Sequence, residues 1–335
     1  MPSGNERPLR VAVAGAGWVS EHHLRGWARV PFAEVVSICD PDDERAVRRA
    51  TAFGVPDVQR DAATMLDAVR PDTLDICAPP NAHAALCALA AARGIATMCQ
   101  KPLASTLSEA RRIAAIASGR MRLMVHENWR FRAPYRQVQA WLQEGCIGNI
   151  VTYRLHSASA GLLPDANGRL PALVRQPLLS RLPRLAIGES LIHHLDVTRW
   201  LLGPLTVVAA RNSYVCPEVA GDDSATIELA SNAGIRIEVS GTFSDPAATP
   251  TGTDHLHIEG TTGRIEFDGR MLELAADRLE THRYDPEVVY ADSYAGAIAH
   301  FADCLRTGTS FETSVDDNLR TLALVETAYR LAARN

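Results

Sequence analysis

The sequence predicts a two-part protein: an α/β domain with a doubly wound parallel sheet, followed by an α+β domain with an open, mostly antiparallel sheet and helices. Up to residue 127, short apolar runs alternate with helical patterns, as crossover helices between parallel strands require. A glycine-rich turn follows the first of these runs. Beyond it, longer runs alternate in polarity, which is typical of antiparallel strands with one covered face. We therefore expect domains over 1–127 and 128–335.

The periodicities also predict the individual elements. Strands of the first domain are expected at 10–14, 35–39, 73–77, 95–99 and 122–125, with a weak one near Val58. Its helices are expected at 19–29, 43–51, 62–69, 82–92 and 105–117, with another at 135–144 in the second domain. Asp61, Asn81 and Ser105 are the expected N-caps. In the second domain we expect strands at 151–156, 206–215, 225–229, 235–242, 255–259 and 264–267, and helices at 187–203 and 314–333. The last helix is expected to pack back on the first domain.

The glycine-rich turn predicts a dinucleotide site. Gly15 permits a tight turn after the first strand, and Gly17 lets backbone approach a pyrophosphate. The helix that follows, starting near Trp18 and Val19, presents unpaired N–H groups and the positive end of its dipole. Asp40 ends the second apolar run, where a carboxylate accepts hydrogen bonds from ribose hydroxyls. Together these features predict a Rossmann nucleotide-binding domain.

The charge of Asp40 favours NAD over NADP. A carboxylate repels a 2′-phosphate, and the next three residues, Pro41, Asp42 and Asp43, offer no cation. Arg45 and Arg48 lie further into the next helix, and their reaching a 2′-phosphate is the alternative.

Further candidate residues follow the other parallel strands, at the edge where ligands bind in such folds. The expected cofactor contacts there are Ala78, Pro79, Asn81, His83 and Gln100. Lys101 follows them and is the single lysine among 34 basic side chains. A guanidinium stays protonated in proteins, whereas an ammonium can donate to a developing alkoxide and take part in proton transfer. Lys101 is therefore the leading catalytic candidate.

The helix expected over 187–203 places Glu189, His193 and Asp196 on one face. This face is a polar patch, a metal site, or an acid-base pair in which His193 removes a hydroxyl proton while Glu189 orients the imidazole. No further His or Cys cluster supports a metal, so we favour acid-base catalysis and expect no metal. His194 is expected to be structural or to lie near the substrate, and Asp196 is a further candidate for contact with the substrate.

Other segments carry weaker signals. Trp129 and Arg130 follow the last strand of the first domain and are expected to touch nicotinamide or substrate, or to pack. The proline-rich segment 161–186 carries four arginines, of which Arg181 and Arg184 are candidates for binding an anionic substrate; solvated charge or a subunit contact is the alternative.

The composition bounds the class of protein. The net charge of −5 does not favour binding to nucleic acid. The sequence shows neither a run of eighteen apolar residues nor the pattern of a secretory leader, so we expect a cytoplasmic protein without a membrane segment. The seven scattered cysteines, several of them in apolar runs, predict reduced buried thiols.

Four motifs together resemble the Gfo/Idh/MocA oxidoreductases. They are Gly15-x-Gly17-x-x-Ser20-x-x-His23, Pro80-Asn81-x-His83, Gln100-Lys101-Pro102 and Glu189-x-x-x-His193-x-x-Asp196. The resemblance implies a two-domain enzyme that moves hydride between NAD and a secondary alcohol carbon of a sugar, sugar derivative or cyclitol, with Lys101 and His193 as catalytic residues. The family's usual glutamate and aspartate are replaced by Gln100 and Glu189.

The expected mechanism holds the substrate hydroxyl between the Lys101 ammonium and His193. A non-catalytic NAD-binding regulator or scaffold, which Gln100 favours, is the alternative. The open sheet predicts a homodimer or homotetramer, because one of its faces would otherwise expose apolar side chains. Those expected to be exposed are Ile227, Leu229, Ile235 and Ile237.

Overall fold

A computed structural model describes residues 7–333, so the first six residues of the polar start lie outside it. The chain divides into two compact units. The first comprises the chain up to Asn128 together with Ala291–Arg320, and the second comprises Trp129–Tyr290 together with the residues from Thr321 onward. The predicted second domain includes residues 291–313, whereas contacts within the structure group this segment with the first unit.

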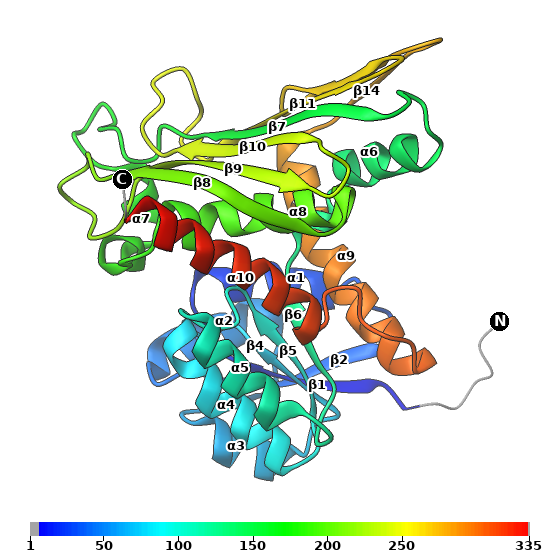
Figure 1. The fold of residues 1–335 in the computed structure, drawn as a ribbon. Coiled ribbons are helices and arrows are strands. Elements are labelled where there is room, and N and C mark those ends of the chain that lie inside the picture. The colour runs from blue at the N-terminus through cyan, green and yellow to red at the C-terminus, as the bar shows by residue number, and fades with distance from the viewer. Residues whose placement is uncertain (1–6, 334–335) are drawn as a thin grey trace. The chain divides into compact units, whose positions relative to one another are not determined.

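The first unit contains a six-stranded sheet in the order β3-β2-β1-β4-β5-β6 (Figure 1). All of its strands are parallel, so the predicted doubly wound sheet is confirmed. Its strands are β1 (Leu9–Ala14), β2 (Ala33–Cys39), β3 (Asp57–Gln59), β4 (Thr73–Ile76), β5 (Ala96–Gln100) and β6 (Leu123–His126). Because these strands are all parallel, the carboxyl ends of β1, β2, β4 and β5 lie at one edge of the sheet.

Helices cover both faces of this sheet, as crossover connections require. They are α1 (Trp18–Trp27), α2 (Asp43–Phe53), α3 (Ala62–Val69), α4 (Pro80–Ala92) and α5 (Leu107–Ala117). Helices α3, α4 and α5 lie side by side (Figure 1). On the other face, Trp27 of α1 packs with Val11 and Val13 of β1 and with Ile298 and Phe301. The last two belong to α9 (Pro286–Thr307), a helix that the sequence reading missed because alanine supplies much of its apolar face.

The predicted helix starts are partly right. The Asp61 carboxylate accepts the Thr64 N–H at 2.8 Å and caps α3, as expected. The predictions at Ser105 and Asn81 are wrong: Thr106 caps α5 through the Glu109 N–H, and α4 begins at Pro80 after Pro79. Proline suits the first helical turn because it lacks the N–H that would have no partner there.

The second unit contains an eight-stranded sheet in the order β14-β13-β12-β11-β7-β10-β9-β8. Only the β7–β10 pair is parallel, so the predicted mostly antiparallel sheet is confirmed. Its strands are β7 (Ile150–Ala158), β8 (Leu205–Ser213), β9 (Ser224–Ser231), β10 (Arg236–Thr242), β11 (Thr253–Gly260), β12 (Arg264–Phe267), β13 (Met271–Ala275) and β14 (Leu279–Arg283). Strands β13 and β14 were not predicted because both are short and their outward positions are half-exposed or exposed.

Helix α8 (Leu191–Leu202) packs against β7 and β10 of this sheet, with α6 (Ala133–Gln143) beside it. The shorter helical segments are η1 (Trp129–Phe131), α7 (Pro171–Arg175), η2 (Pro177–Arg181) and η3 (Ala186–Ser190), and the last helix is α10 (Val315–Ala332). The apolar side chains predicted to be exposed are instead covered within one copy, since Ile227, Leu229 and Ile237 are buried and Ile235 is half-buried. That argument for a homo-oligomer is therefore wrong.

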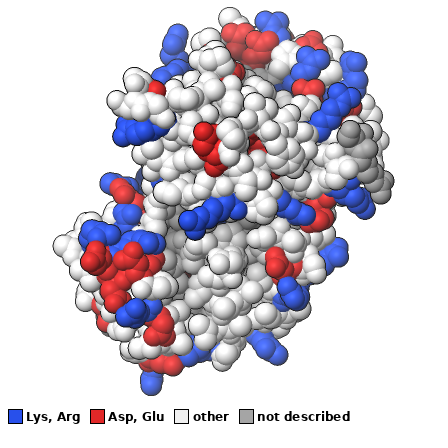
Figure 2. Space-filling view, turned by 90° about the vertical axis from the view of Figure 1, so that its left-hand side faces the viewer, with Lys and Arg blue, Asp and Glu red and all other residues white. Residues whose placement is uncertain are grey.

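Within residues 7–333, no helix is long and apolar enough to cross a membrane. On the face shown in Figure 2, acidic and basic side chains occur in mixed groups and do not form a continuous basic stripe.

The seven cysteines form no disulfide, and five of them are buried. Burial raises the pKa of the Cys39 thiol to about 12 and raises the pKa values of Cys77 and Cys99 well above the usual range. Buried, protonated thiols are poor nucleophiles.

Alkylation should therefore distinguish these thiols. We expect iodoacetamide to modify at most Cys146 and Cys216 in the native protein, because these two alone are half-buried rather than buried, and to modify all seven cysteines in denaturant. Mass spectrometry of tryptic peptides measures this, and rapid native modification of Cys77 or Cys99 would contradict the structure.

Candidate active site

The glycine turn after β1 contacts the loop after β4 directly. Gly15 has a φ of +105°, and a Cβ atom on it would lie 2.7 Å from the Ala78 nitrogen and 2.8 Å from the Cys77 carbonyl carbon. Gly17 has open space where a Cβ would stand and precedes α1 without a side-chain cap. At Gly15 the turn packs tightly against the loop after β4, whereas at Gly17 it leaves open space next to the backbone. A phosphate-binding turn requires both features.

The Asp40 carboxylate joins this turn to the end of β2. One of its oxygens accepts the Ala16 N–H at 2.8 Å and the other accepts the Asp42 N–H at 2.9 Å. Arg45 lies nearby, with one guanidinium nitrogen 2.8 Å from Asp42 and another 3.8 Å from Asp40. The carboxylate is buried but lies at the edge of the sheet expected for the ribose.

The residues expected to follow β4 at this edge have different environments. Pro79 and Asn81 are exposed and Ala78 is half-buried. His83 is fully buried, and its ring nitrogens lie 2.8 Å from the Ala78 carbonyl oxygen and 3.1 Å from that of Leu103. Burial lowers the pKa of His83. We therefore correct its expected role: His83 cannot contact a cofactor, and instead ties the loop after β4 to the loop that carries Lys101.

A buried hydrogen-bond chain leads to Lys101. The Asp75 carboxylate in β4 accepts the Trp27 indole N–H at 2.7 Å and contacts the His23 Nδ1 atom at 2.8 Å. The Nε2 atom of His23 lies 2.9 Å from the Gln100 side-chain nitrogen, and the Gln100 oxygen accepts the Lys101 backbone N–H at 2.7 Å. Lys101 itself is half-buried at the end of β5.

The chain fixes the tautomer of His23. Because the Gln100 oxygen accepts the Lys101 N–H, its NH2 group must face His23 and donate to Nε2. The imidazole proton is then on Nδ1, where it donates to Asp75. Gln100 thus links His23 to the Lys101 backbone through a neutral side chain, so the residue before Lys101 carries no ionisable group.

In the second unit, the predicted helix over 187–203 is divided. Residues Ala186–Ser190 form a π-helical turn, in which Glu189 is half-buried, and α8 begins only at Leu191. The buried Asp222 carboxylate holds this turn, accepting the N–H groups of Leu185 at 2.9 Å and Ile187 at 3.0 Å. Such π-helical turns occur frequently at functional sites.

His193 follows this turn and is buried on α8. Its imidazole stacks on the indole of Trp129, with the ring centres 3.9 Å apart and the planes 15° from parallel. The guanidinium of Arg132 lies over the same indole, 3.9 Å from its centre. Trp129 thus packs against both His193 and Arg132, which agrees with the packing alternative, and it is half-buried.

Asp254 in β11 connects these groups and was not predicted. It accepts hydrogen bonds from Trp129 at 3.1 Å, Arg132 at 2.7 Å and Tyr135 at 2.8 Å, and it contacts His194 Nε2 at 2.8 Å. Burial alone would raise the pKa of Asp254, but the charges of His194 and Arg132 and the hydrogen bonds from His194 and Tyr135 hold it well below its usual value. His194 is therefore a buried structural residue.

Arg130 and Asp196 also have structural roles. Both are buried, and they form a bidentate ion pair, with the Arg130 Nη2 atom 2.7 Å from the carboxylate. Thr321 donates to the same carboxylate at 2.7 Å. The expected contacts of Arg130 with cofactor and of Asp196 with substrate are thus corrected, because each charged group is turned toward the other.

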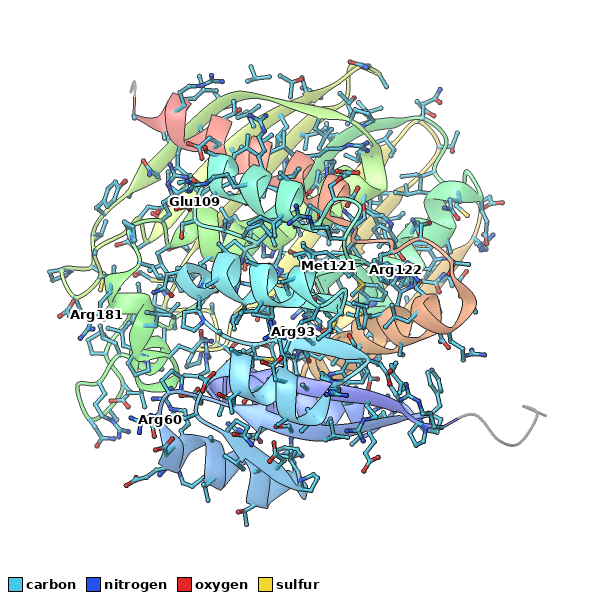
Figure 3. All side chains as sticks on the ribbon, turned by 90° about the horizontal axis from the view of Figure 1, so that it is seen from below. Arg60, Arg93, Glu109, Met121, Arg122 and Arg181 are labelled. Carbon is cyan, nitrogen blue, oxygen red and sulfur yellow. The ribbon has the colours of Figure 1, made fainter. Side chains whose placement is uncertain are left out.

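The two arginines considered for an anion differ. Arg184 pairs with Glu326 at 2.9 Å and its guanidinium lies 4.8 Å from the centre of the Tyr329 ring, so it anchors the segment to α10 within the second unit. Arg181, labelled in Figure 3, is exposed on η2.

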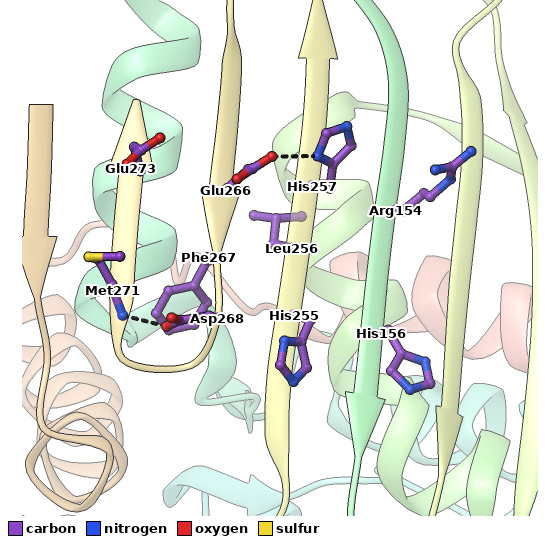
Figure 4. A pocket seen from close by; sticks show the side chains of 10 residues that line it. All are labelled: Arg154, His156, His255, Leu256, His257, Glu266, Phe267, Asp268, Met271 and Glu273. Atoms are coloured by element: carbon purple, nitrogen blue, oxygen red, sulfur yellow. Dashed lines mark hydrogen bonds and ion pairs between the residues drawn. The ribbon is translucent and has the colours of Figure 1, made fainter. Parts of the chain in front are cut away.

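A cavity of about 390 Å³ lies on the face of the second sheet that α8 does not cover (Figure 4). Its polar lining includes Arg154 and His156 of β7, His255 and His257 of β11, and Glu266 of β12. His257 and Glu266 form an ion pair at 3.3 Å. None of the predicted site residues lines this cavity.

The two glycines of the turn give a matched pair of variants. We expect Gly15→Ala to lower the free energy of unfolding by roughly 1–3 kcal/mol, because both its φ and its space exclude a Cβ atom. Gly17→Ala should change stability by less than about 0.5 kcal/mol but weaken dinucleotide binding, because the added methyl group fills the open space. Urea unfolding and NADH fluorescence titration measure the two effects; a stable Gly15→Ala protein would contradict the packing.

Comparison with known proteins agrees with this geometry. Residues 9–127 match the model of the oxidoreductase family with an NAD-binding Rossmann fold, and residues 135–266 match the GFO/IDH/MocA C-terminal domain. The chain is 36% identical to a D-apiose dehydrogenase of Paraburkholderia graminis, over 97% of this chain and 88% of the relative. It is 29% identical to an inositol 2-dehydrogenase of Saccharopolyspora erythraea, over 70% and 68% of the two chains.

Solved structures show the same fold. An oxidoreductase from Agrobacterium radiobacter in complex with NAD+, L-tartaric acid and magnesium superposes with a TM-score of 0.90 at 30% identity, covering 97% of this chain and 96% of that one. Levoglucosan dehydrogenase in complex with NADH and levoglucosan superposes with a TM-score of 0.86 at 22% identity, covering 98% of each chain. The resemblance seen in the motifs is confirmed: the chain belongs to the Gfo/Idh/MocA oxidoreductase family.

Proposed function

We propose that this protein is an NAD-dependent dehydrogenase or reductase that transfers hydride to or from a secondary alcohol or ketone carbon of a sugar, sugar derivative or cyclitol. Membership of the family supports the reaction class, and the D-apiose and inositol dehydrogenases among its relatives support the substrate class. The observation that carries the proposal is Lys101, held by Gln100 at the sheet edge that also presents Gly17 and Asp40.

The residues at this edge fit a dinucleotide. The open space at Gly17 and the N–H groups at the start of α1, near Trp18 and Val19, suit a pyrophosphate. Asp40 suits a ribose, and Ala78, Pro79 and Asn81 would border the bound molecule. When bound, NAD supplies the hydride acceptor or donor.

Lys101 and His193 are the proposed catalytic residues, one from each unit. The Lys101 ammonium would donate a hydrogen bond to the substrate oxygen and stabilise the negative charge that develops on it. His193 would accept the hydroxyl proton during oxidation, with Glu189, in the turn before α8, orienting its ring. Substitution of Lys101 and of His193 tests each role separately. In the non-catalytic alternative, neither substitution would have activity to remove.

The direct test is an NAD(H)-linked screen of aldoses including D-apiose, keto-sugars, inositols and sugar nucleotides. We expect absorbance at the wavelength of NADH to change with at least one of them. Binding of NADH without turnover of any of these compounds would instead support the regulator or scaffold.

Substitution of Lys101 should remove turnover. We expect Lys101→Arg and Lys101→Ala each to lower kcat by at least ~100-fold, because arginine keeps the charge but not the compact donor and alanine keeps neither. Arg112→Ala, at an exposed position of α5, is the control and should keep normal kcat. Near-normal kcat in Lys101→Arg would contradict the role of the ammonium.

The proposed preference for NAD rests on Asp40. We expect wild-type protein to bind NADH more tightly than NADPH, and Asp40→Asn to reduce this preference by about tenfold, equivalent to about 1.4 kcal/mol, because the charge that repels a 2′-phosphate is removed. Arg45 would then be the nearest cation to that phosphate. Dissociation constants from fluorescence titration measure both values, and tighter binding of NADPH by wild type would reject the preference.

The homodimer or homotetramer and the cytoplasmic location remain proposals, and sedimentation analysis and cell fractionation test them. Binding of an anionic group of the substrate by Arg181 is likewise a proposal, since this side chain is exposed on η2.

A further inference from the structure

The indole of Trp129 is restrained in the second unit in two different ways. His193 and Arg132 contact its π face, which restricts tilting of the ring. A face contact of this kind permits the ring to slide and to turn in its own plane. The hydrogen bond from the indole N–H to Asp254 is directional, and at 3.1 Å it fixes the remaining orientation.

Asp254 restrains more than the indole. The same carboxylate oxygen accepts the Arg132 N–H at 2.7 Å, so it also fixes the guanidinium over the ring. Its other oxygen contacts His194, the neighbour of His193 on α8, at 2.8 Å. One buried carboxylate therefore holds the Trp129 ring on which His193 stacks and also the side chain of His194, the neighbour of His193 on α8.

We propose that Asp254 is a positioning residue for His193, acting through the ring of Trp129. This inference rests on the proposed function, in which His193 accepts the hydroxyl proton. A base must lie within hydrogen-bond reach of the proton that it removes, and small displacements of a catalytic group lower the rate steeply. Asp254 would thus affect turnover without touching substrate.

Three variants test this role. Asp254→Asn keeps an oxygen acceptor of the same size but removes the charge that holds Arg132 and His194. Trp129→Phe keeps an aromatic face for His193 but removes the N–H, and it serves if Asp254→Asn fails to fold. Tyr153→Phe is the matched control, because it removes a buried hydroxyl bonded to Thr198 in the same unit but outside the stack.

The readouts separate ring position from activity. The first is the NMR signal of the His193 ring protons, which the Trp129 ring current displaces, assigned by its loss in His193→Gln. The second is kcat and KM for a sugar substrate found in the screen, and the third is the dissociation constant of NADH.

We expect Asp254→Asn to shift the His193 signal and to lower kcat by about 10- to 100-fold, with a much smaller change in KM and in NADH affinity. Trp129→Phe should lower kcat in the same direction; it is judged by kcat and KM alone, because the new ring changes the ring current by itself. Tyr153→Phe should leave both signal and kcat unchanged. An unshifted His193 signal in Asp254→Asn, or unchanged kcat in Trp129→Phe, would overturn the proposal. A shifted signal with unchanged kcat would overturn it too, and would also reject His193 as the base. Absence of turnover in wild type with every sugar would reject the proposed function, while the NMR signal would still report on the stack.

Discussion

A buried carboxylate holds the side chains around each of the two proposed catalytic residues, Lys101 in the first unit and His193 in the second. In the first unit, Asp75 holds His23 and Trp27, and the chain continues through Gln100 to the backbone of Lys101. A buried carboxylate is costly unless several donors satisfy it. Because every donor must stay in place to avoid that cost, such a group is a stringent geometric restraint on its neighbours.

Asp254 has the same physical character in the second unit, where Arg132 supplies compensating charge and His194 Nε2 lies 2.8 Å from the other carboxylate oxygen. Its donors come from η1, from α6 and the residue before it, and from α8, whereas the carboxylate is on β11. Asp254 thus joins segments that are distant in sequence but lie around His193. Groups fixed before substrate binds need little reorganisation during the reaction, which is the main way in which proteins stabilise charge that develops in a transition state.

The local features were predictable from sequence. The turn at Gly15, the carboxylate at Asp40 and the parallel strands of the first sheet follow from periodicity and from rules that apply within about 30 residues. The Asp61 cap is likewise a contact between near neighbours. Lys101 is the catalytic candidate because it is the single lysine among 34 basic side chains, and this role stays a prediction.

The long-range partners could not be predicted in this way. Arg130 pairs with Asp196, 66 residues away, and Trp129 bonds to Asp254, 125 residues away, so neither pair has a local pattern. His83 was expected to contact the cofactor, and His194 to be structural or to lie near the substrate, because a polar side chain near a motif gives no indication of its burial. One signal was present: Asp75 interrupts an apolar strand, and a charge at such a position requires a buried partner. The π-helical turn before α8 likewise displaces Glu189 from the regular helical spacing assumed for it.

In the proposed reaction these restrained groups serve direct hydride transfer from a sugar carbon to NAD. Mass spectrometry of the NADH formed from NAD+ and a substrate sugar carrying deuterium at every carbon tests this transfer. We expect one deuterium in each NADH molecule, located at C4 of the nicotinamide. NADH that contains no deuterium would contradict it.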